Sequence, residues 1–387
     1  MNEIRPLWVT TADGVRDVCS AAAEVGRLAL DTEADSFHSY RSKLCLIQIS
    51  FERTHALIDP LAITSPDLAP LAAVLADPAV IVVMHGADYD LRVLNRDLGA
   101  SVRGVRDTQA AAQLLGEEQT GLAALLEKYL GVTLDKRFQR ADWSQRPLPM
   151  ELLGYAANDT AHLGVLVGKL ERLLRSAGRL DWWIEECTAL ERIRWEAPEA
   201  DDLAFDRVKG ASRLHREARD RLAALFRWRE EIAAERDVAP FRVVRNEVLL
   251  AVAEAGASTP KELAELPGVG QGIVRRWGRG ILDALRDVPQ APARPVKPRF
   301  ELDRAREERI RRLRQVRDEA ANELAVSAGL LAPRALLEAI VDEPPAGEQE
   351  LARLLQREWR ARVLAPAVLP LAASWALNRK SGGAAIS

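Results

Sequence analysis

Residues 27–33 of the chain read RLALDTE, an apolar run that ends in two carboxylates, Asp31 and Glu33. The run follows an alanine-rich helical segment and precedes residues 44–49, which are rich in strand-forming residues, and this is typical of a short buried strand. Side chains alternate along a strand, so Asp31 and Glu33 project from the same face. Two carboxylates held side by side repel each other, and a divalent metal ion is the usual counter-charge. The stretch therefore predicts part of a metal site, provided that other ligands follow.

Two further acids stand at positions where a site could form. An isolated Asp-x-Glu is more often a solvated pair where a strand meets a loop, so the interpretation depends on these acids. Asp90 comes shortly after residues 80–84, which read as a buried strand. Asp159 follows Tyr155 by four residues on a helix that begins near residue 149, which places both side chains on one helical face. We therefore expect four carboxylates and a tyrosine to converge.

Two neighbours of Asp90 offer alternative roles. Asp88 competes with Asp90 as a ligand, and we expect Asp90 to fill that role. His85 also follows the buried strand, and we expect a neutral histidine that is hydrogen-bonded to the backbone there rather than a general base.

The expected ligands are all oxygens. Such a ligand set suits Mg²⁺ or Mn²⁺ better than zinc. Two ions of this kind form a clamp for in-line attack on a phosphodiester, and Tyr155 is positioned to orient the attacking water or to share in its activation. The pattern therefore favours phosphodiester hydrolysis.

Composition limits the class of protein. The chain has 387 residues, which favours two or three domains. Its 54 basic and 57 acidic residues exclude a uniformly basic nucleic-acid binder. Its 3 cysteines are isolated, so they predict neither a disulfide framework nor a zinc site. Without a signal peptide or a long apolar run, we expect a soluble cytoplasmic protein with no membrane contact. Residues 164–170 do not fit a nucleotide-binding loop, so we expect no ATP.

The chain divides by pattern into several parts. Strand-like and helix-like segments alternate in residues 1–200, which is typical of an α/β domain. Residues 211–289 are helical, and residues 290–299 are proline-rich and read as a linker. Residues 300–378 are helical again, and their pattern predicts one helix over residues 347–363. We expect residues 379–387 to be a disordered tail. Residues 225–235 resemble residues 313–323, which indicates a duplicated helical module.

Basic residues come shortly before the helix that carries Tyr155. They offer a rim that could hold phosphates, although a solvated loop is an equally good interpretation. The turn LPGVG at residues 266–270 is similarly open between a phosphate-binding hairpin and a plain helix connection. The candidate nucleic-acid-binding residues are Lys136, Arg137, Arg140 and Arg146.

Three blocks in order, LDTE at residues 30–33, MHGADYDL at 84–91 and YAAND at 155–159, resemble the ribonuclease D family of DEDD 3′-5′ exonucleases in its tyrosine subclass. Residues 211–289 are similar to an HRDC domain, and residues 300–378 to a more divergent copy. The resemblance implies a ribonuclease H-like α/β exonuclease domain with a mixed five-stranded sheet, followed by two all-α HRDC-type domains. It implies two divalent metal ions, Mg²⁺ or Mn²⁺, and these catalytic residues: Asp31, Glu33, Asp90, Tyr155 and Asp159.

The resemblance also implies a substrate. It is RNA with a 3′ tail, such as tRNA precursors and other small structured RNAs, from which nucleoside 5′-monophosphates are released one at a time. Ala34 stands where the family often has an aromatic residue, but no metal ligand is lost. Two alternatives remain open, a 3′-5′ exodeoxyribonuclease with the same chemistry and a non-catalytic RNA-binding scaffold.

Overall fold

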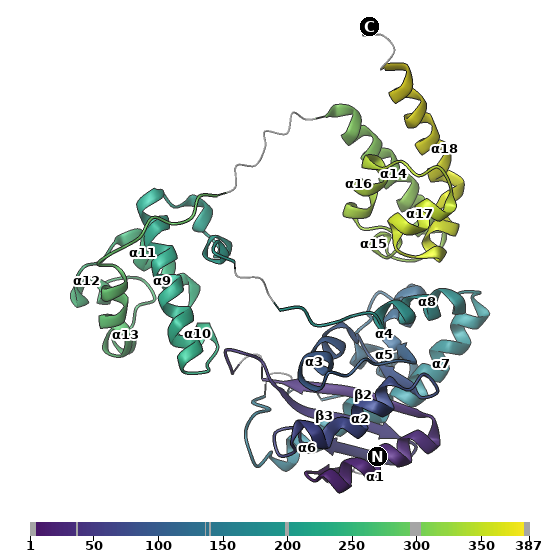
Figure 1. Ribbon diagram of the computed structural model, residues 1–387, viewed down its shortest axis with the longest axis horizontal. Helices are drawn as coiled ribbons and strands as arrows, with labels where there is room; N and C mark the ends of the chain where they lie inside the picture. Colours follow the sequence, from purple (N-terminus) through teal and green to yellow (C-terminus); the bar gives the residue numbers. More distant parts are fainter. Residues whose placement is uncertain are drawn as a thin grey trace.

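The protein folds into three units, which the computed structural model shows in Figure 1. The structure describes residues 5–35, 38–135, 137–138, 141–197, 201–294 and 303–382, with the backbone alone for residues 376–382. An N-terminal α/β domain precedes a first helical unit, residues 201–294, and a second helical unit, residues 303–382. Each unit contains its own cluster of buried apolar side chains. In the described part of the chain, no helix is both long and apolar enough to cross a membrane.

A mixed six-stranded sheet forms the centre of the α/β domain, with the strand order β1-β4-β3-β2-β5-β6. β2 runs antiparallel to β3 and parallel to β5. The strands are β1 (Leu7–Val9), β2 (Arg27–Ala34), β3 (Leu44–Phe51), β4 (Thr54–Ile58), β5 (Ile81–Met84) and β6 (Val105–Asp107). β2 and β3 therefore lie in the middle of the sheet, and every residue of β3 is buried.

The expected number of five strands is wrong, because the sheet has six. The difference lies in β1, which pairs in parallel with β4, Leu7 opposite Ala56 and Val9 opposite Ile58. A strand of three residues is too short to show the alternation that marks a strand in a sequence. The mixed character of the sheet agrees with the expectation.

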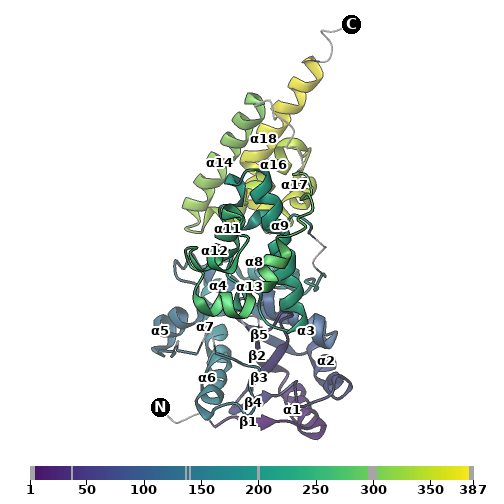
Figure 2. The same ribbon diagram turned by 90° about the vertical axis from the view of Figure 1, so that its left-hand side faces the viewer.

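Helices cover both faces of the sheet. Figure 2 shows α1, α2 and α3 on one side of the strands and α5, α6 and α7 on the other. α6 packs on β2, β3 and β4, and its apolar residues Leu152 and Ala156 join a buried cluster with Leu46 and Leu57. The helices are α1 (Ala12–Val25), α2 (Ala69–Ala76), α3 (Asp88–Leu98), α4 (Thr108–Leu114), α5 (Leu122–Leu130), α6 (Met150–Ala161), α7 (Leu163–Ser176) and α8 (Leu180–Leu190).

The first helical unit consists of five α-helices, two of them very short. They are α9 (Arg216–Glu235), α10 (Pro240–Val243), α11 (Asn246–Ala255), α12 (Pro260–Ala264) and α13 (Gln271–Ala284). The LPGVG turn connects α12 to α13, and Gly268 takes a positive φ of 79° there. Glycine adopts this backbone conformation without the steric cost that a Cβ brings.

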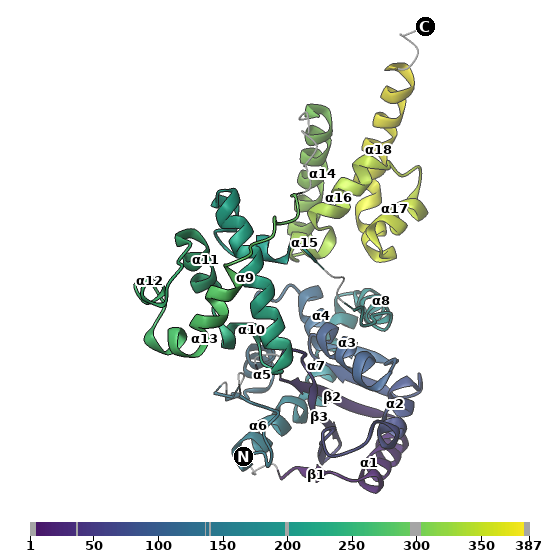
Figure 3. The same cartoon turned by 60° about the vertical axis from the view of Figure 1, so that its left-hand side comes forward.

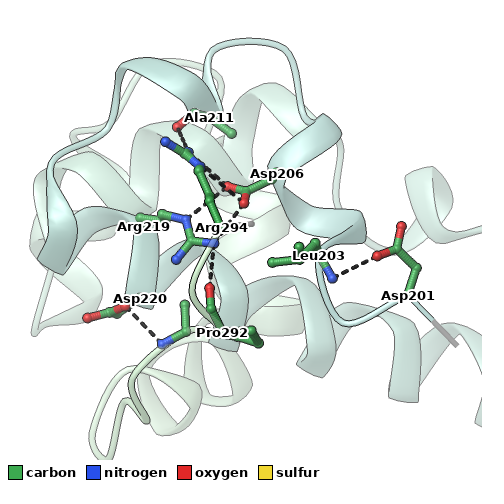
Figure 4. Close-up of polar contacts among 9 residues, drawn as sticks. Asp201, Leu203, Asp206, Ala211, Arg219, Asp220, Pro292 and Arg294 are labelled. Atoms are coloured by element: carbon green, nitrogen blue, oxygen red, sulfur yellow. Dashed lines mark hydrogen bonds and ion pairs between the residues drawn. The ribbon is translucent and has the colours of Figure 1, made fainter. Parts of the chain in front are cut away.

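Asp206 holds the two ends of the first helical unit together (Figure 4). It lies ahead of α9, and its Oδ2 accepts a hydrogen bond from Arg219 Nη2 at 2.7 Å. Its Oδ1 accepts one from Nη2 of Arg294, near the end of the unit, at 2.9 Å. Partial burial opposes ionisation of this carboxyl, but the hydrogen bonds and charges of both arginines lower its pKa to about 2. The chain therefore enters and leaves this unit at one place.

The second helical unit repeats the order of the first. Its helices are α14 (Arg304–Glu323), α15 (Ala328–Leu331), α16 (Arg334–Asp342), α17 (Glu348–Leu355) and α18 (Glu358–Gly382). α14 has 20 residues, as α9 does, and α15 has 4, as α10 does. The buried positions of the long first helices also coincide, with Leu222, Leu225 and Ala233 in α9 and Ile310, Leu313 and Ala321 in α14.

Two expectations for the second helical unit differ from the structure. A single helix was expected over residues 347–363, but Gln356 has a positive φ of 60° and separates α17 from α18. The tail expected to be disordered from residue 379 is helical through Gly382, and residues 383–387 lie outside the described part. Half of the expected linker, residues 295–299, also lies outside it.

The second helical unit packs against the α/β domain. Figure 3 shows its α15 end meeting the domain. Trp359 of α18 stacks on Trp182 of α8, with ring centroids 4.8 Å apart and planes 16° from parallel. Oε1 of the buried Glu186 accepts a hydrogen bond from Trp359 Nε1 at 2.8 Å and one from Arg360 Nη2 at 3.0 Å. Aromatic stacking and a paired buried charge together make this a specific interface.

The first helical unit contacts the loop between β2 and β3. The backbone N–H of Ala239 donates to the carbonyl oxygen of His38 at 3.3 Å, and Lys43 forms an ion pair with Asp237. Tyr40 packs against the apolar core of the unit. The loop that leaves the strand of Asp31 and Glu33 is thus held by a neighbouring unit.

Candidate active site

β2 presents Asp31 and Glu33 on the face of the sheet that α6 covers. In the antiparallel pairing with β3, Asp31 lies opposite Gln48 and Glu33 opposite Leu46, which belongs to the cluster beneath α6. The register shifts directly after Glu33, so regular pairing ends where the second carboxylate leaves the strand. The alternation of the strand therefore places the two acids as the sequence predicts.

α6 brings Asp159 and Tyr155 to the same place, one helical turn apart. Carboxylate oxygens of Asp31, Glu33 and Asp159 all lie within 4.8 Å of one another. Across the described residues, this is the one group of three or more His, Cys, Asp or Glu side chains with that spacing. The structure thus joins two acids of a strand to one acid of a helix more than a hundred residues later.

Asp90 reaches the site from the first turn of α3. It is 7% exposed, and its Oδ1 accepts a hydrogen bond from the hydroxyl of Thr32, between the two acids of β2. Its oxygens are not part of the three-carboxylate group, but its charge raises the pKa of both Asp31 and Glu33. Asp88, in contrast, is exposed and forms an ion pair with Arg92. Asp90 is therefore the acid of α3 that lies beside the cluster.

Burial is the main reason why the pKa values of these carboxyl groups lie above their usual range. It raises the pKa of Glu33 to about 9 and that of Asp159 to about 7. It also raises the pKa of Asp31 well above its usual range, and the charges of Asp90, Asp159 and Glu33 raise it further. The pKa of Asp90 rises to about 6, with burial outweighing the hydrogen bond from Thr32. Such mutual repulsion fits a site built for a cation, and an all-oxygen set fits Mg²⁺ or Mn²⁺.

Tyr155 lies beside the acids and lines two cavities. Its ring packs edge-on against Phe138, with centroids 5.8 Å apart, and lies 6.1 Å from the ring of Trp143. Burial and the charges of Asp159, Glu33 and Asp31 raise the pKa of its hydroxyl, which therefore stays protonated near neutral pH. Cavities of about 240 and 330 Å³ lie on this side, and both are lined by Leu134, Asp135, Tyr155 and Asp159.

Of the four candidate phosphate-binding residues, the structure describes two, and one of these two is bound inside the domain. Arg137 is exposed, lines the smaller cavity and pairs with Asp135, its Nε 2.7 Å from Oδ2. Arg146 points inward, and its Nε and Nη2 each bind the buried Asp59 at 2.7 Å. Its Nη1 donates to backbone carbonyls, so Arg146 holds the domain together and we remove it from the phosphate-binding set. Lys136 and Arg140 lie outside the described residues.

His85 is largely buried, and its Nδ1 lies 2.9 Å from the hydroxyl of Thr108. Burial lowers its pKa, which favours the neutral ring, while the charge of Asp107 opposes this shift to a smaller degree. The expected partner was the backbone, and the hydroxyl of Thr108 takes that place.

Sequence reasoning missed Gln48, which lies opposite Asp31 on β3. A signal was available, because Gln48 is a polar residue with apolar neighbours in a strand that reads as buried. Its side chain is fully buried, and neither its Nε2 nor its Oε1 has a hydrogen-bond partner among the described residues.

Comparison with known proteins identifies two domain types in the chain. A family model of 3′-5′ exonucleases matches residues 6–175, and one of HRDC domains matches residues 218–285. Ribonuclease D of Escherichia coli strain K12 is 35% identical over 286 residues, which cover 73% of this chain and 75% of the relative. That of Haemophilus influenzae is 34% identical over 279 residues, covering 72% and 69%.

Solved structures give the same result. The crystal structure of Escherichia coli RNase D, an exoribonuclease involved in structured RNA processing, has a TM-score of 0.66 and 29% identity, covering 96% of this chain and 99% of that one. The catalytic core of RRP6 from Trypanosoma brucei has a TM-score of 0.67 and 27% identity, covering 73% and 79%. The ordered acids, the domain models and the extent of these likenesses show that the chain belongs to the ribonuclease D family of 3′-5′ exoribonucleases.

Proposed function

We propose that this exoribonuclease works with two divalent metal ions, Mg²⁺ or Mn²⁺, held by Asp31, Glu33, Asp90 and Asp159. The observation that carries the proposal is the approach of oxygens from Asp31, Glu33 and Asp159 to within 4.8 Å of one another. The raised pKa values of these acids support it, since repelling carboxylates are stabilised by a cation. When bound, such ions lower the pKa of a water and stabilise charge on the leaving oxygen.

Tyr155 orients the attacking water in this proposal. Its hydroxyl remains protonated because burial and the nearby acids raise its pKa, so it acts as a hydrogen-bond donor and not as a phenolate base. Packing against Phe138 and Trp143 fixes the direction of the ring. A donor held in this way loses little freedom when it binds a water.

The substrates that we propose are RNAs with a 3′ tail, above all tRNA precursors and other small structured RNAs, shortened with release of nucleoside 5′-monophosphates in the cytoplasm. The relative from Escherichia coli, which acts in structured RNA processing, supports this substrate class. The HRDC domain matched at residues 218–285 also supports an RNA substrate. At the cavity next to Tyr155, Arg137 is a candidate for binding backbone phosphates. Its sequence neighbours Lys136 and Arg140 complete the proposed set.

The second helical unit is, in our proposal, a divergent second HRDC domain. The support comes from the matched lengths and buried positions of α9 and α14 and of the short helices that follow them. Deleting residues 303–382 should weaken RNA binding and its salt dependence while cleavage of a short single strand continues.

The experiment that tests the proposed function is a cleavage time course. A 5′-labelled tRNA with a 3′ extension and a single-stranded DNA of equal length are incubated with Mg²⁺, with Mn²⁺ and with EDTA. The wild type is compared with Asp31→Ala, and with Asp88→Ala as a control, because Asp88 is exposed, pairs with Arg92 and is not part of the three-carboxylate group. We expect a metal-dependent ladder from the 3′ end of the RNA for the wild type and the control, and none for Asp31→Ala.

Each other outcome selects an alternative. Faster degradation of the DNA would indicate an exodeoxyribonuclease. Binding of the RNA without cleavage would indicate a scaffold. Cleavage that continues in EDTA, or in Asp31→Ala, would contradict the metal site.

A further inference from the structure

Gln48 is a buried polar residue without a partner. The side chain is 0% exposed, and neither its amide nitrogen nor its amide oxygen makes a hydrogen bond to any described residue. Most buried polar groups in proteins are paired, and an unpaired one is costly to keep. An amide in this state calls for an explanation, such as a partner that arrives with a ligand.

The direction of the Gln48 side chain follows from its neighbours on β3. Residues two apart on a strand share a face. On one side of Gln48, Leu46 packs in the cluster beneath α6. On the other side, the hydroxyl of Ser50 lies 2.6 Å from that of Thr160, next to Asp159 on α6. Gln48 therefore also points toward α6, into the layer that holds the carboxylates.

The position of Gln48 follows from the register of the sheet. It lies directly opposite Asp31 in the antiparallel pair of β2 and β3. Residues opposite each other in such a pair project to the same side, with Cβ atoms about 4.5–5.5 Å apart. The amide of Gln48 is thus the cross-strand neighbour of a carboxylate that belongs to the three-acid cluster.

We propose that Gln48 is a positioning residue of the active site, whose amide Nε2 donates a hydrogen bond to the Asp31 carboxylate when the metal site is loaded. The proposal rests on the metal site proposed above. A carboxylate that binds a metal ion has lone pairs left over, and donors in a second layer hold it in the binding orientation. Oε1 of Gln48 has no donor of its own among the described residues and remains available for a water of the same site.

The test compares Gln48→Met with the wild-type full-length protein. Methionine keeps the length and the apolar contacts of the side chain but has no N–H donor. Affinity for Mn²⁺ is measured by calorimetry, without RNA, and thermal unfolding is measured in EDTA. We expect Mn²⁺ to bind about 10–100-fold more weakly in the variant. In EDTA the Tm should be unchanged or higher, because an unpaired amide has been removed.

Ser50→Ala serves as the matched control. It lies on the same face of the same strand and loses the contact with Thr160. We expect a lower Tm in EDTA and an affinity for Mn²⁺ within about twofold of the wild type, since the loss is confined to strand and helix packing.

The possible outcomes distinguish a failure of the role of Gln48 from a failure of the proposed metal site. Equal affinity for Mn²⁺ in the wild type and Gln48→Met would overturn the role of Gln48 and leave the metal site standing. A lower Tm of Gln48→Met in EDTA would show that the amide already has a partner in the metal-free protein, and would overturn it as well. If the wild type bound no Mn²⁺, both proposals would fail together.

Discussion

Arg229 and Arg317 make the same hydrogen bond in the two helical units. Nη1 of Arg229 donates to the carbonyl oxygen of Val244 at 3.4 Å, and Nη1 of Arg317 donates to that of Ala332 at 2.9 Å. Each acceptor is the residue directly after the short helix that follows the long one, α10 in the first unit and α15 in the second. An arginine in each unit thus ties the long helix to the turn that follows it.

Arg229→Met should destabilise the first helical unit by about 1–3 kcal/mol, because it leaves the carbonyl oxygen of the buried Val244 without this donor. Arg317→Met should act in the same direction on the second unit. Urea denaturation followed by circular dichroism measures both losses. Arg227→Met, at an exposed position of α9, is the control and should change stability by less than about 0.5 kcal/mol. If Arg227→Met lowered the free energy of unfolding as much as Arg229→Met, the hydrogen bond from Arg229 to Val244 would have no specific effect on stability.

Asp159→Asn should remove turnover and at the same time stabilise the metal-free protein. The substitution removes a proposed metal ligand, and it also removes a charge that raises the pKa of Asp31 and Glu33. Burial raises the pKa of Asp159 to about 7, so the ionised side chain destabilises the folded protein at pH 8. We expect the free energy of unfolding of the variant to be about 1–3 kcal/mol higher at this pH, which is less than the full pKa shift would give. Activity assays and thermal unfolding in EDTA measure the two effects. A variant that is both inactive and less stable would argue against repulsion within the cluster.

Stability of the metal-free protein should fall as the pH rises from about 5 to about 9. The folded state holds protons on Glu33, Asp159 and Asp90, whose pKa values are about 9, 7 and 6. The unfolded chain has already released its protons near pH 5, so a rising pH favours unfolding. Excess Mg²⁺ should remove most of the decline, because metal binding requires the deprotonated acids. Tm values measured in EDTA and in Mg²⁺ test this, and Glu33→Gln should flatten the EDTA curve between about pH 7 and 9.

Tyr155→Phe should lower kcat by about 10²–10³-fold, the range found when one positioned hydrogen-bond donor is removed from an active site. The phenyl ring keeps the packing against Phe138 and Trp143, so Tm should change little. Since the raised pKa keeps the hydroxyl protonated, the wild-type rate should show no rise with the ionisation of a tyrosine. Steady-state kinetics on a short RNA provides the measurement, and an unchanged kcat would remove Tyr155 from the mechanism.

Trp359→Ala should release the second helical unit from the α/β domain. The side chain is fully buried, stacks on Trp182 and donates to Glu186, and its loss should cost about 3–5 kcal/mol. Small-angle scattering should then report a larger radius of gyration, and limited proteolysis should release the second helical unit more rapidly. Trp195→Ala, at a half-exposed tryptophan, is the control and should leave both measurements unchanged.

The acids of the site were predictable because local periodicity determines them. Alternation on β2 places Asp31 and Glu33 on one face, and one helical turn on α6 does the same for Tyr155 and Asp159. Asp90 follows a strand that is apolar throughout. Each of these positions depends on a few neighbouring residues, which a sequence shows directly.

Features that depend on distant partners were not predictable in this way. Arg146 reads as a surface cation until Asp59, far away in the sequence, is seen to accept both of its hydrogen bonds. β1 is too short to show a period and depends on β4 for its pairing. Trp359 could have filled the core of its own unit, and only the structure shows it against Trp182.

The ion pairs of Asp206 hold the beginning and the end of the first helical unit next to each other. Because arginines from the beginning and from the end of the unit share this one carboxylate, its entry and exit points adjoin. A segment whose ends meet can be exchanged for another with neighbouring termini without stretching the chain on either side. The unit matched by the HRDC model can therefore be exchanged, in evolution or by protein engineering, without moving the chain ends of the nuclease domain and the second helical unit.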